Sequence, residues 1–162
     1  MAEKLNAENI EKAVQHLEDI QTGKTPILSD LEGNIKEKQK KVFPLIPPND
    51  PRLLMQVAPF MDDTLEQFGF ADRKELSKVM YDNMAKYGGL GLSANQLGLP
   101  YRMFVMGGHP QIEDGKVRSV FNPLINDVSP ESINLKEGCL SFPFLFLSIK
   151  RPKWCSVKYT DE

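Results

Sequence analysis

Glu137-Gly138-Cys139-Leu140-Ser141 is the stretch on which both the fold and the chemistry of this chain depend. The segments on both sides of it have the apolar patterns of β-strands. A thiol in such a place can be a metal ligand, a nucleophile or a core side chain. The role of Cys139 therefore decides the function, and the rest of the sequence has to distinguish the alternatives.

The composition indicates one ordinary domain without an evident charged partner. The chain has 162 residues and a net charge of −2, which gives no reason to expect direct readout of nucleic acid or binding to a membrane surface. Apolar runs stay well short of the roughly 20 residues of a membrane span. The first residues lack an apolar signal core, so we expect a cytoplasmic protein with reduced cysteines.

Residues 1–42 differ from the rest and predict a helical N-terminal arm. Apolar residues recur there at helical spacing, at Ile10, Ala13, Val14, Leu17 and Ile20. His16 beside this stripe is interpreted as a surface or boundary histidine. Four prolines between Pro44 and Pro51 then predict an extended linker. We place the domain boundary here, with residues 43–162 as the compact domain.

The compact domain reads as one helix followed by antiparallel strands. Asp72 and Glu75 form a capping-box pattern, and Gly88-Gly89 ends the helical periodicity that follows it. Strand patterns come next, at residues 101–106, 117–121, 144–147 and 155–160. We expect the strand at 144–147 to be buried or half-buried. The order predicts an α+β fold of antiparallel sheets packed around helices.

A glycine-rich stretch, residues 88–96, lies between the helix and the first strand. It lacks the Gly-Lys-Ser/Thr ending of a phosphate-binding loop. It follows a helix and opens a strand, which is the reverse of a dinucleotide-binding turn. The remaining interpretation is a loop that places Gln96, a side-chain donor, beside a groove lined by backbone.

Judged from its own residues, Cys139 has no complete site. A nucleophilic cysteine needs a histidine base, and the histidine of the compact domain is His109, in a Gly-Gly-His-Pro turn. A metal-binding cysteine needs two or three further ligands. The sequence contains neither His-Glu-x-x-His nor Cys-x-x-Cys, so both roles stay open at this point.

Taken together, the two stretches resemble the motifs of the peptide deformylase family. Residues 89–96, Gly-Leu-Gly-Leu-Ser-Ala-Asn-Gln, are similar to its first motif, with Ser93 in place of an alanine. Residues 137–141 match the second motif, Glu-Gly-Cys-Leu-Ser, in full. The resemblance covers about residues 45–162. It implies hydrolytic removal of the formyl group from N-formylmethionyl nascent polypeptides by a metal-activated water.

The resemblance also implies a role for each matching residue. Cys139 would be a ligand of a divalent metal, most commonly iron(II), with zinc or nickel as alternatives. Gln96 and the backbone N–H of Leu140 would donate to the oxyanion. The remaining motif residues would line the substrate groove, namely Gly89, Leu90, Gly91, Glu137 and Gly138. The expected partners are the formylated peptide and the ribosome.

The third motif of the family, His-Glu-x-x-His on a C-terminal helix, is absent from these 162 residues. Neither His16 nor His109 has a second histidine four residues away. We therefore expect a deformylase-like domain that lacks the metal-binding helix, through truncation or natural shortening. A non-catalytic relative that binds a peptide or ribosomal partner is the alternative function. A thiol enzyme using Cys139 and His109 is a third.

Overall fold

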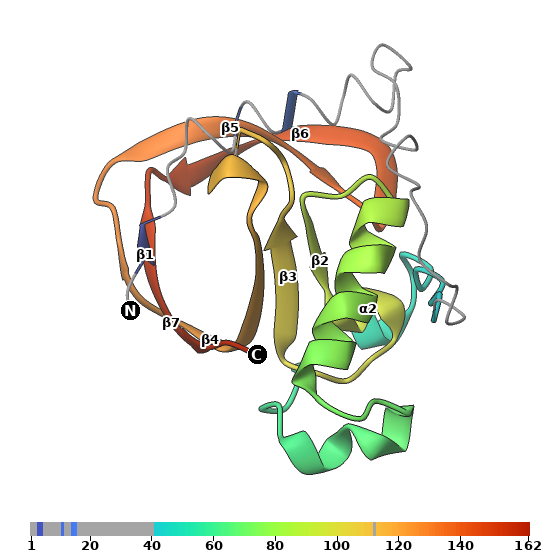
Figure 1. The fold of residues 1–162 in the computed structure, drawn as a ribbon. Helices are drawn as coiled ribbons and strands as arrows, with labels where there is room; N and C mark the ends of the chain where they lie inside the picture. Colours follow the sequence, from blue (N-terminus) through green and yellow to red (C-terminus); the bar gives the residue numbers. More distant parts are fainter. Residues whose placement is uncertain (1–2, 5–10, 12–13, 16–40, 112) are drawn as a thin grey trace.

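The computed structural model describes residues 3–4, 11, 14–15, 41–111 and 113–162 (Figure 1). The described part contains one long helix, α2 (Arg73–Lys86), together with short 3-10 turns. Most of the predicted helical arm, including His16, lies outside the described residues, so the domain boundary stays a prediction. The strands are β1 (Glu3–Lys4), β2 (Gly91–Ser93), β3 (Met103–Gly107), β4 (Val117–Val128), β5 (Ser132–Cys139), β6 (Phe142–Pro152) and β7 (Cys155–Thr160).

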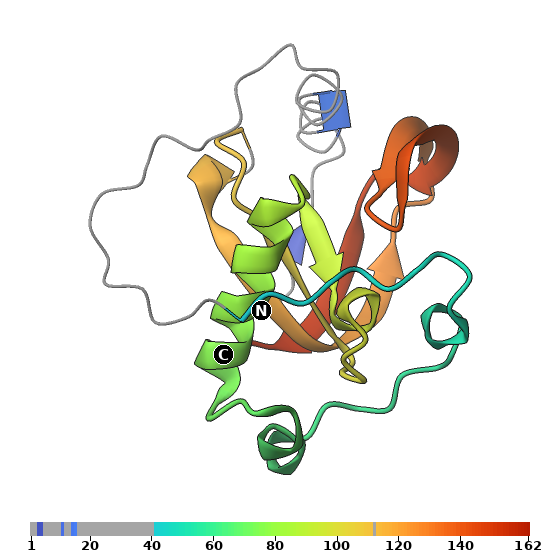
Figure 2. The same cartoon turned by 90° about the vertical axis from the view of Figure 1, so that its right-hand side faces the viewer.

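These strands form two antiparallel sheets. The larger has the order β1-β7-β4-β3-β2, and the smaller is the β5–β6 hairpin. The hairpin turns at Leu140 and Ser141, because Cys139 pairs with Phe142. Figure 2 shows β2 between α2 and the end of this hairpin. The Glu137–Ser141 motif therefore lies at the tip of a hairpin that faces the edge of the larger sheet.

Helix α2 begins where the sequence predicts. The carboxylate of Asp72 accepts a hydrogen bond from the Glu75 backbone N–H at 2.8 Å, as an N-cap does. Glu75 Oε2 accepts from the N–H of Ala71 at 2.7 Å, one residue before the position that a capping box requires. Met80 and Met84 on this helix are core residues with 0% and 3% exposure.

The proline-rich segment after residue 40 has no regular structure but is docked on α2. Asn83 of α2 accepts from the Phe43 N–H at 2.9 Å and donates to the Lys41 carbonyl at 3.1 Å. Tyr87 Oη donates to the carbonyl of Phe43 at 2.7 Å. The N–H of Ile46 donates to the carbonyl of Gln96 at 2.9 Å. The segment predicted as a linker is thus a strap that ties α2 to the glycine-rich stretch.

The alternation of side chains along β3 separates the core from the site. Met103 and Val105 point to the α2 side and are buried in the core. Phe104 and Met106 point the other way and are half-buried. Successive residues of a strand face opposite sides of the sheet, so β3 forms the wall between them. The side away from α2 is where the candidate site lies.

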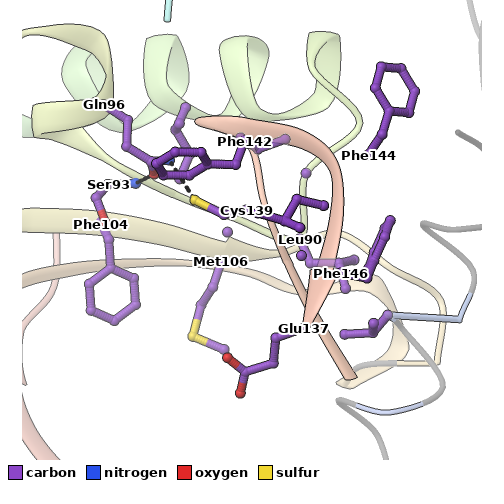
Figure 3. A pocket seen from close by; sticks show the side chains of 17 residues that line it. Leu90, Ser93, Gln96, Phe104, Met106, Glu137, Cys139, Phe142, Phe144 and Phe146 are labelled. Carbon is purple, nitrogen blue, oxygen red and sulfur yellow. Dashed lines mark hydrogen bonds between the residues drawn. The ribbon is translucent and has the colours of Figure 1, made fainter. Parts of the chain in front are cut away.

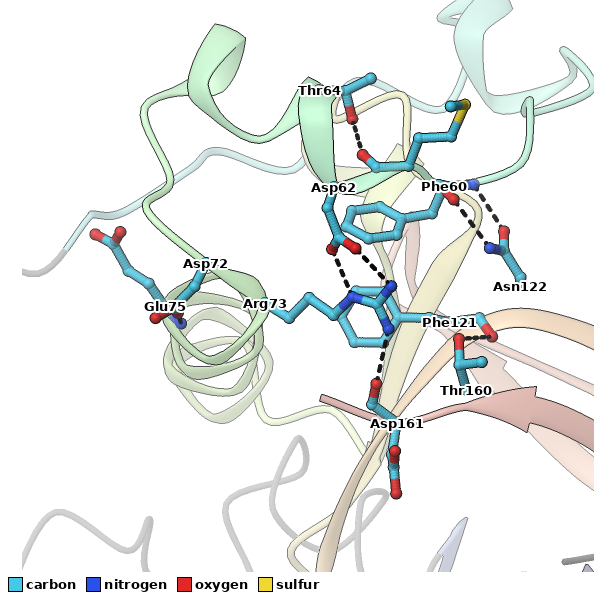
Figure 4. Close-up of polar contacts among 11 residues, drawn as sticks. Phe60, Asp62, Thr64, Asp72, Arg73, Glu75, Phe121, Asn122, Thr160 and Asp161 are labelled. Atoms are coloured by element: carbon cyan, nitrogen blue, oxygen red, sulfur yellow. Dashed lines mark hydrogen bonds and ion pairs between the residues drawn. The ribbon is translucent and has the colours of Figure 1, made fainter.

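An arginine cluster joins the start of α2 to the end of β7 (Figure 4). Arg73 pairs with both carboxylate oxygens of Asp62, at 2.6 and 2.9 Å, and donates to the Asp161 carbonyl at 3.1 Å. Its guanidinium also lies 5.3 Å from the ring centre of Phe60 and 5.2 Å from that of Phe121. Because the pair is hydrogen-bonded, the pKa of Asp62 is lowered and that of Arg73 is raised.

Two expectations from the sequence are wrong in detail. The stretch predicted as a loop at residues 88–96 contains strand β2 and a 3-10 turn, Ala94–Leu97. The strand at 144–147 is not buried as a unit, since Phe144 is 77% exposed and Leu147 is 52% exposed. Within the described residues, no helix is long and apolar enough to cross a membrane.

Candidate active site

The structure brings both glycine-containing motifs to one cavity of about 390 Å³. Its walls come from the glycine-rich stretch with β2, from β3, from the β5–β6 hairpin and from Val14 of the N-terminal segment (Figure 3). The lining includes every residue that the sequence analysis assigned to the site, namely Gly89, Leu90, Gly91, Gln96, Glu137, Gly138, Cys139 and Leu140. Motifs more than 40 residues apart in the sequence are therefore adjacent in space.

Gln96 and Cys139 face each other across this cavity. The thiol of Cys139 is exposed, and Gln96 Nε2 lies 4.0 Å from its Sγ. Figure 3 shows the sulfur pointing toward Gln96. A side-chain N–H and a thiol at the same mouth form a polar pair in a mostly apolar wall, as is common in small-molecule and peptide sites.

The amide of Gln96 is held by two serines that the sequence analysis did not assign to the site. The backbone N–H of Ser93 donates to Gln96 Oε1 at 2.9 Å, and Gln96 Nε2 donates to Ser141 Oγ at 3.1 Å. Ser141 is buried, with 6% exposure. Because Oε1 accepts from a backbone N–H, the amide is oriented with its donor toward Cys139 and Ser141. The sequence signal that could have identified these two residues is the single serine in each motif, Ser93 in the first and Ser141 in the second.

Packing across the cavity brings side chains close to the backbone at two motif glycines. A Cβ on Gly89 would lie 2.6 Å from Leu140 Cδ1. A Cβ on Gly138 would lie 2.8 Å from Cε1 of Phe146, its pairing partner in the hairpin. Glycine is used here for close approach, so the two walls come into contact around Leu140 and Phe146.

The carboxylate of Glu137 is already engaged. Arg151, on the neighbouring strand β6, donates to both of its oxygens at 2.8 Å. The pair holds the carboxylate at the wall of the cavity, and the hydrogen bond to Glu137 raises the pKa of Arg151. Glu137 therefore forms an ion pair within the hairpin. A ligand that reaches Glu137 meets a carboxylate already paired with Arg151.

His109 does not complete a thiol-imidazole pair. It is buried just after β3, where its Nδ1 accepts from the N–H of Gln111 at 3.2 Å. It is not among the residues that line the cavity of Cys139. The geometry therefore gives no support to the thiol-enzyme hypothesis.

Comparison with known proteins agrees with this arrangement. The polypeptide deformylase family model matches residues 44–162. The chain belongs to the peptide deformylase family. A peptide deformylase of Wolbachia sp. subsp. Brugia malayi is 41% identical over 127 residues, which are 68% of this chain and 69% of that protein. One from Thermotoga maritima is 42% identical over 88 residues, so the chain spans about half of that relative.

Solved structures of deformylases have the same fold. The crystal structure of the Thermotoga maritima enzyme superimposes with a TM-score of 0.61 at 32% identity, covering 74% of each chain. The Ehrlichia chaffeensis enzyme in complex with actinonin gives a TM-score of 0.63 at 33% identity, covering 74% of this chain and 69% of that one. The predicted α+β fold and the prediction of a deformylase-type amide hydrolase are confirmed at the level of the family.

The family uses a divalent metal, and Cys139 is of a residue type that binds such ions. Thiolate suits iron, nickel and zinc, and Cys139 is exposed at the cavity. A catalytic metal usually takes three protein ligands. Among residues 3–4, 11, 14–15, 41–111 and 113–162, however, no group of three or more His, Cys, Asp or Glu could hold a metal. These residues alone do not make a complete site.

Proposed function

We propose that this chain binds N-formylmethionyl peptides in the cavity between β2 and the β5–β6 hairpin and acts in their deformylation. Its place would be the cytoplasm, where formylated chains leave the ribosome. The observation that carries the proposal is the convergence of Gln96, Cys139 and Leu140 on one cavity. The family to which the chain belongs supplies the reaction.

Gln96 and Leu140 are proposed as the donors to the formyl oxygen. Attack on the formyl carbon turns the carbonyl oxygen into an oxyanion, and fixed N–H donors stabilise that charge. Gln96 meets the requirement for a fixed donor, because Ser93 and Ser141 hold its amide. The backbone N–H of Leu140 is the second proposed donor. Loss of one such donor typically costs about 10²–10³ in rate.

Strand β2 is proposed as the docking edge for the peptide backbone. It ends the order of the larger sheet, and in the described residues it pairs with β3 on one side. An extended peptide can add to a sheet edge through main-chain hydrogen bonds. Gly91 of β2 carries no side chain, so a peptide can come close to the backbone there. Leu90, Glu137 and Gly138 would complete the walls of the groove.

Cys139 is proposed as one ligand of the divalent metal. Iron(II) is our assignment, with zinc and nickel as alternatives that thiolate also binds. When bound, the metal would supply the activated water. Because the described residues provide one ligand of the usual three, we expect residues 1–162 alone to bind these ions weakly and to lack turnover. Stoichiometric metal after dialysis, together with hydrolysis of a formyl-Met peptide, would contradict this expectation.

Peptide binding tests the proposal without depending on turnover. In the presence of a chelator, we expect formyl-Met-Ala-Ser amide to bind more tightly than the same peptide without formyl. Gln96→Ala should weaken formyl-peptide binding about 2–10-fold, since a hydrogen bond contributes roughly 0.5–1.5 kcal/mol. The measurement is isothermal titration calorimetry.

The control is Asn95→Ala, in the same 3-10 turn but outside the lining of the cavity. It should leave the affinity for the formylated peptide unchanged. If wild-type chain bound neither peptide, the proposed function would be wrong. Peptide binding without turnover in a chain that carries a His-Glu-x-x-His motif and metal would favour the non-catalytic relative instead.

A further inference from the structure

The N-terminal arm, residues 1–42, contributes a side chain to the cavity that the two motifs share. Val14 lines this cavity together with residues of β2, β3 and the β5–β6 hairpin, and it is 9% exposed. In Figure 1 a short blue segment of the arm lies beside this hairpin. The polypeptide deformylase model matches residues 44–162, so Val14 comes from outside the matched region. The contact is therefore made by a part of the chain that the family model does not describe.

The described residues next to Val14 have the pattern of an amphipathic helix. Glu11, Val14 and Gln15 have helical backbone. Glu11 and Gln15 are four residues apart, so they share one helix face, and both are exposed. Val14 lies off that face and is buried. A helix of this kind is stabilised mainly by packing its apolar face on another element, and the packing surface at Val14 is the cavity wall.

The surface that receives Val14 is apolar. The lining of the cavity includes Leu90, Phe104, Met106 and Phe146. On the hairpin side of the same lining, Phe142 is 46% exposed and Leu145 is 48% exposed. An apolar side chain is stabilised when it leaves water for such surroundings. The arm therefore finds at this cavity the partner that its apolar residue requires.

A second contact ties the start of the arm to the larger sheet. Strand β1 pairs with β7, with Glu3 opposite Val157 and Lys4 opposite Ser156. This contact is made by backbone, whereas the contact at the cavity is made by a buried side chain. Substitution of Val14 consequently tests the docking at the cavity without changing the pairing of β1.

The docked arm bounds the cavity without filling it. About 390 Å³ remains with Val14 in the lining, which is within the range of roughly 300–1,000 Å³ for ligand sites. Gln96 and Cys139 are part of the same lining, and Cys139 is exposed. An arm that blocked the site would cover these groups. The geometry is that of an additional wall.

We propose that the N-terminal arm docks in cis through Val14 and forms a wall of the peptide site. The docked arm has two consequences. It narrows the access to Cys139, and it gives a bound formylated peptide a further apolar contact. The second consequence rests on the proposed function, while the first concerns the thiol alone and is independent of it.

The first test measures alkylation of Cys139 by N-ethylmaleimide in the presence of a chelator. Mass spectrometry counts Cys139 and Cys155 separately. Val14→Ser should raise the rate at Cys139 about 3–10-fold, because loss of the buried methyl groups shifts the arm toward its undocked state. Gln15→Ser places the same new residue at the neighbouring exposed position and should leave the rate unchanged. Val14→Ile keeps an apolar side chain and should protect Cys139 where Val14→Ser does not.

The second test measures the affinity for formyl-Met-Ala-Ser amide by calorimetry. Val14→Ser should weaken binding about 3–10-fold, because the complete site is then present in a smaller fraction of the molecules. Gln15→Ser should bind the peptide as the wild type does. Val14 lies outside the core cluster around α2, so the compact domain should stay folded in both variants. Circular dichroism spectra equal to that of the wild type would verify this.

The outcomes separate the arm from the proposed function. Equal alkylation of Val14→Ser and the wild type would overturn the docking of the arm. Faster alkylation with unchanged peptide affinity would overturn the wall, and tighter peptide binding would overturn it as well and make the arm a competitor of the peptide. If the wild-type chain bound no formylated peptide, the proposed function would fail, and the alkylation rates would still decide whether the arm docks.

Discussion

The α2 side and the hairpin side of the molecule use similar apolar residues in opposite ways. On the α2 side, Leu76 and Val105 are both 0% exposed, in a core that α2, β2 and β3 share. On the hairpin side, Phe144 and Leu147 are 77% and 52% exposed. Apolar composition therefore does not determine burial, because a side chain is buried only where another element packs on it. The α2 side forms the core of the fold, and the hairpin side leaves apolar side chains exposed beside the cavity.

The largest expected difference in stability is between truncations of one leucine on each side. Leu76→Ala should lower the free energy of unfolding by about 2–5 kcal/mol, because it removes fully buried methyl groups and leaves a cavity. Leu145→Ala, at a residue that is 48% exposed, should change it by less than about 1 kcal/mol. Urea denaturation measures both. A cost at Leu145 equal to that at Leu76 would mean that the hairpin is packed like the core.

Alanine substitution of one glycine on each side tests the same comparison between the core and the hairpin. A Cβ on Gly107, at the end of β3, would lie 2.1 Å from the Lys116 carbonyl oxygen, at φ of +100°. Gly107→Ala should therefore destabilise the protein by more than about 2 kcal/mol, since backbone has to move.

Gly138→Ala meets the Phe146 ring instead, which is the end of a side chain and not backbone. Its cost should stay below about 1 kcal/mol, within the range of most surface changes. Thermal unfolding followed by circular dichroism distinguishes the pair. If Gly138→Ala were the more damaging change, Phe146 would have to be locked in place by more than the hairpin.

The smallest expected effect is electrostatic and concerns the arginine cluster on the α2 side. The pKa of Asp62 is lowered from its ordinary 3.8, first by its hydrogen bond to Arg73. The unfolded chain therefore takes up this proton at higher pH than the folded chain does. The contribution of the pair is complete above about pH 4 and is lost as the pH falls through the lowered pKa.

The Asp62 side chain is 61% exposed, so the contribution should stay below about 1 kcal/mol. Urea titrations between pH 2 and pH 7 should show less acid sensitivity in Asp62→Asn than in the wild type. Glu131→Gln is the matched change on the hairpin side, where Lys153 lowers the pKa of an exposed carboxyl. A larger effect at Glu131 would contradict the special role of the Arg73 cluster.

Local signals predicted the elements that short-range physics controls. The cap at Asp72, the glycine stop after the helix and the apolar periodicity of α2 are local features, and the helix lies where they place it. The two motifs likewise pointed to Gln96 and Cys139, which lie 4.0 Å apart at their nearest side-chain atoms.

Other features depend on contacts that the sequence does not reveal. Strand β2 is three residues long, too short for a periodic pattern, and it forms because it pairs with β3. The proline-rich strap reads as a linker, yet Asn83 and Tyr87 hold it on the helix through side chains distant in sequence. The apolar run at 144–147 reads as buried because hydropathy does not report whether another element covers it.

The sequence by itself predicted which residues line the candidate site, because residue type fixes what a thiol, an amide or a glycine can do. It identified Cys139, Gln96 and the glycines of both motifs. The tertiary structure decided how they are held: Ser93 and Ser141 orient Gln96, and Arg151 engages Glu137. It also decided which apolar side chains stay exposed beside the site. Burial and hydrogen-bond partners arise from elements far apart in the chain, and no local pattern encodes them.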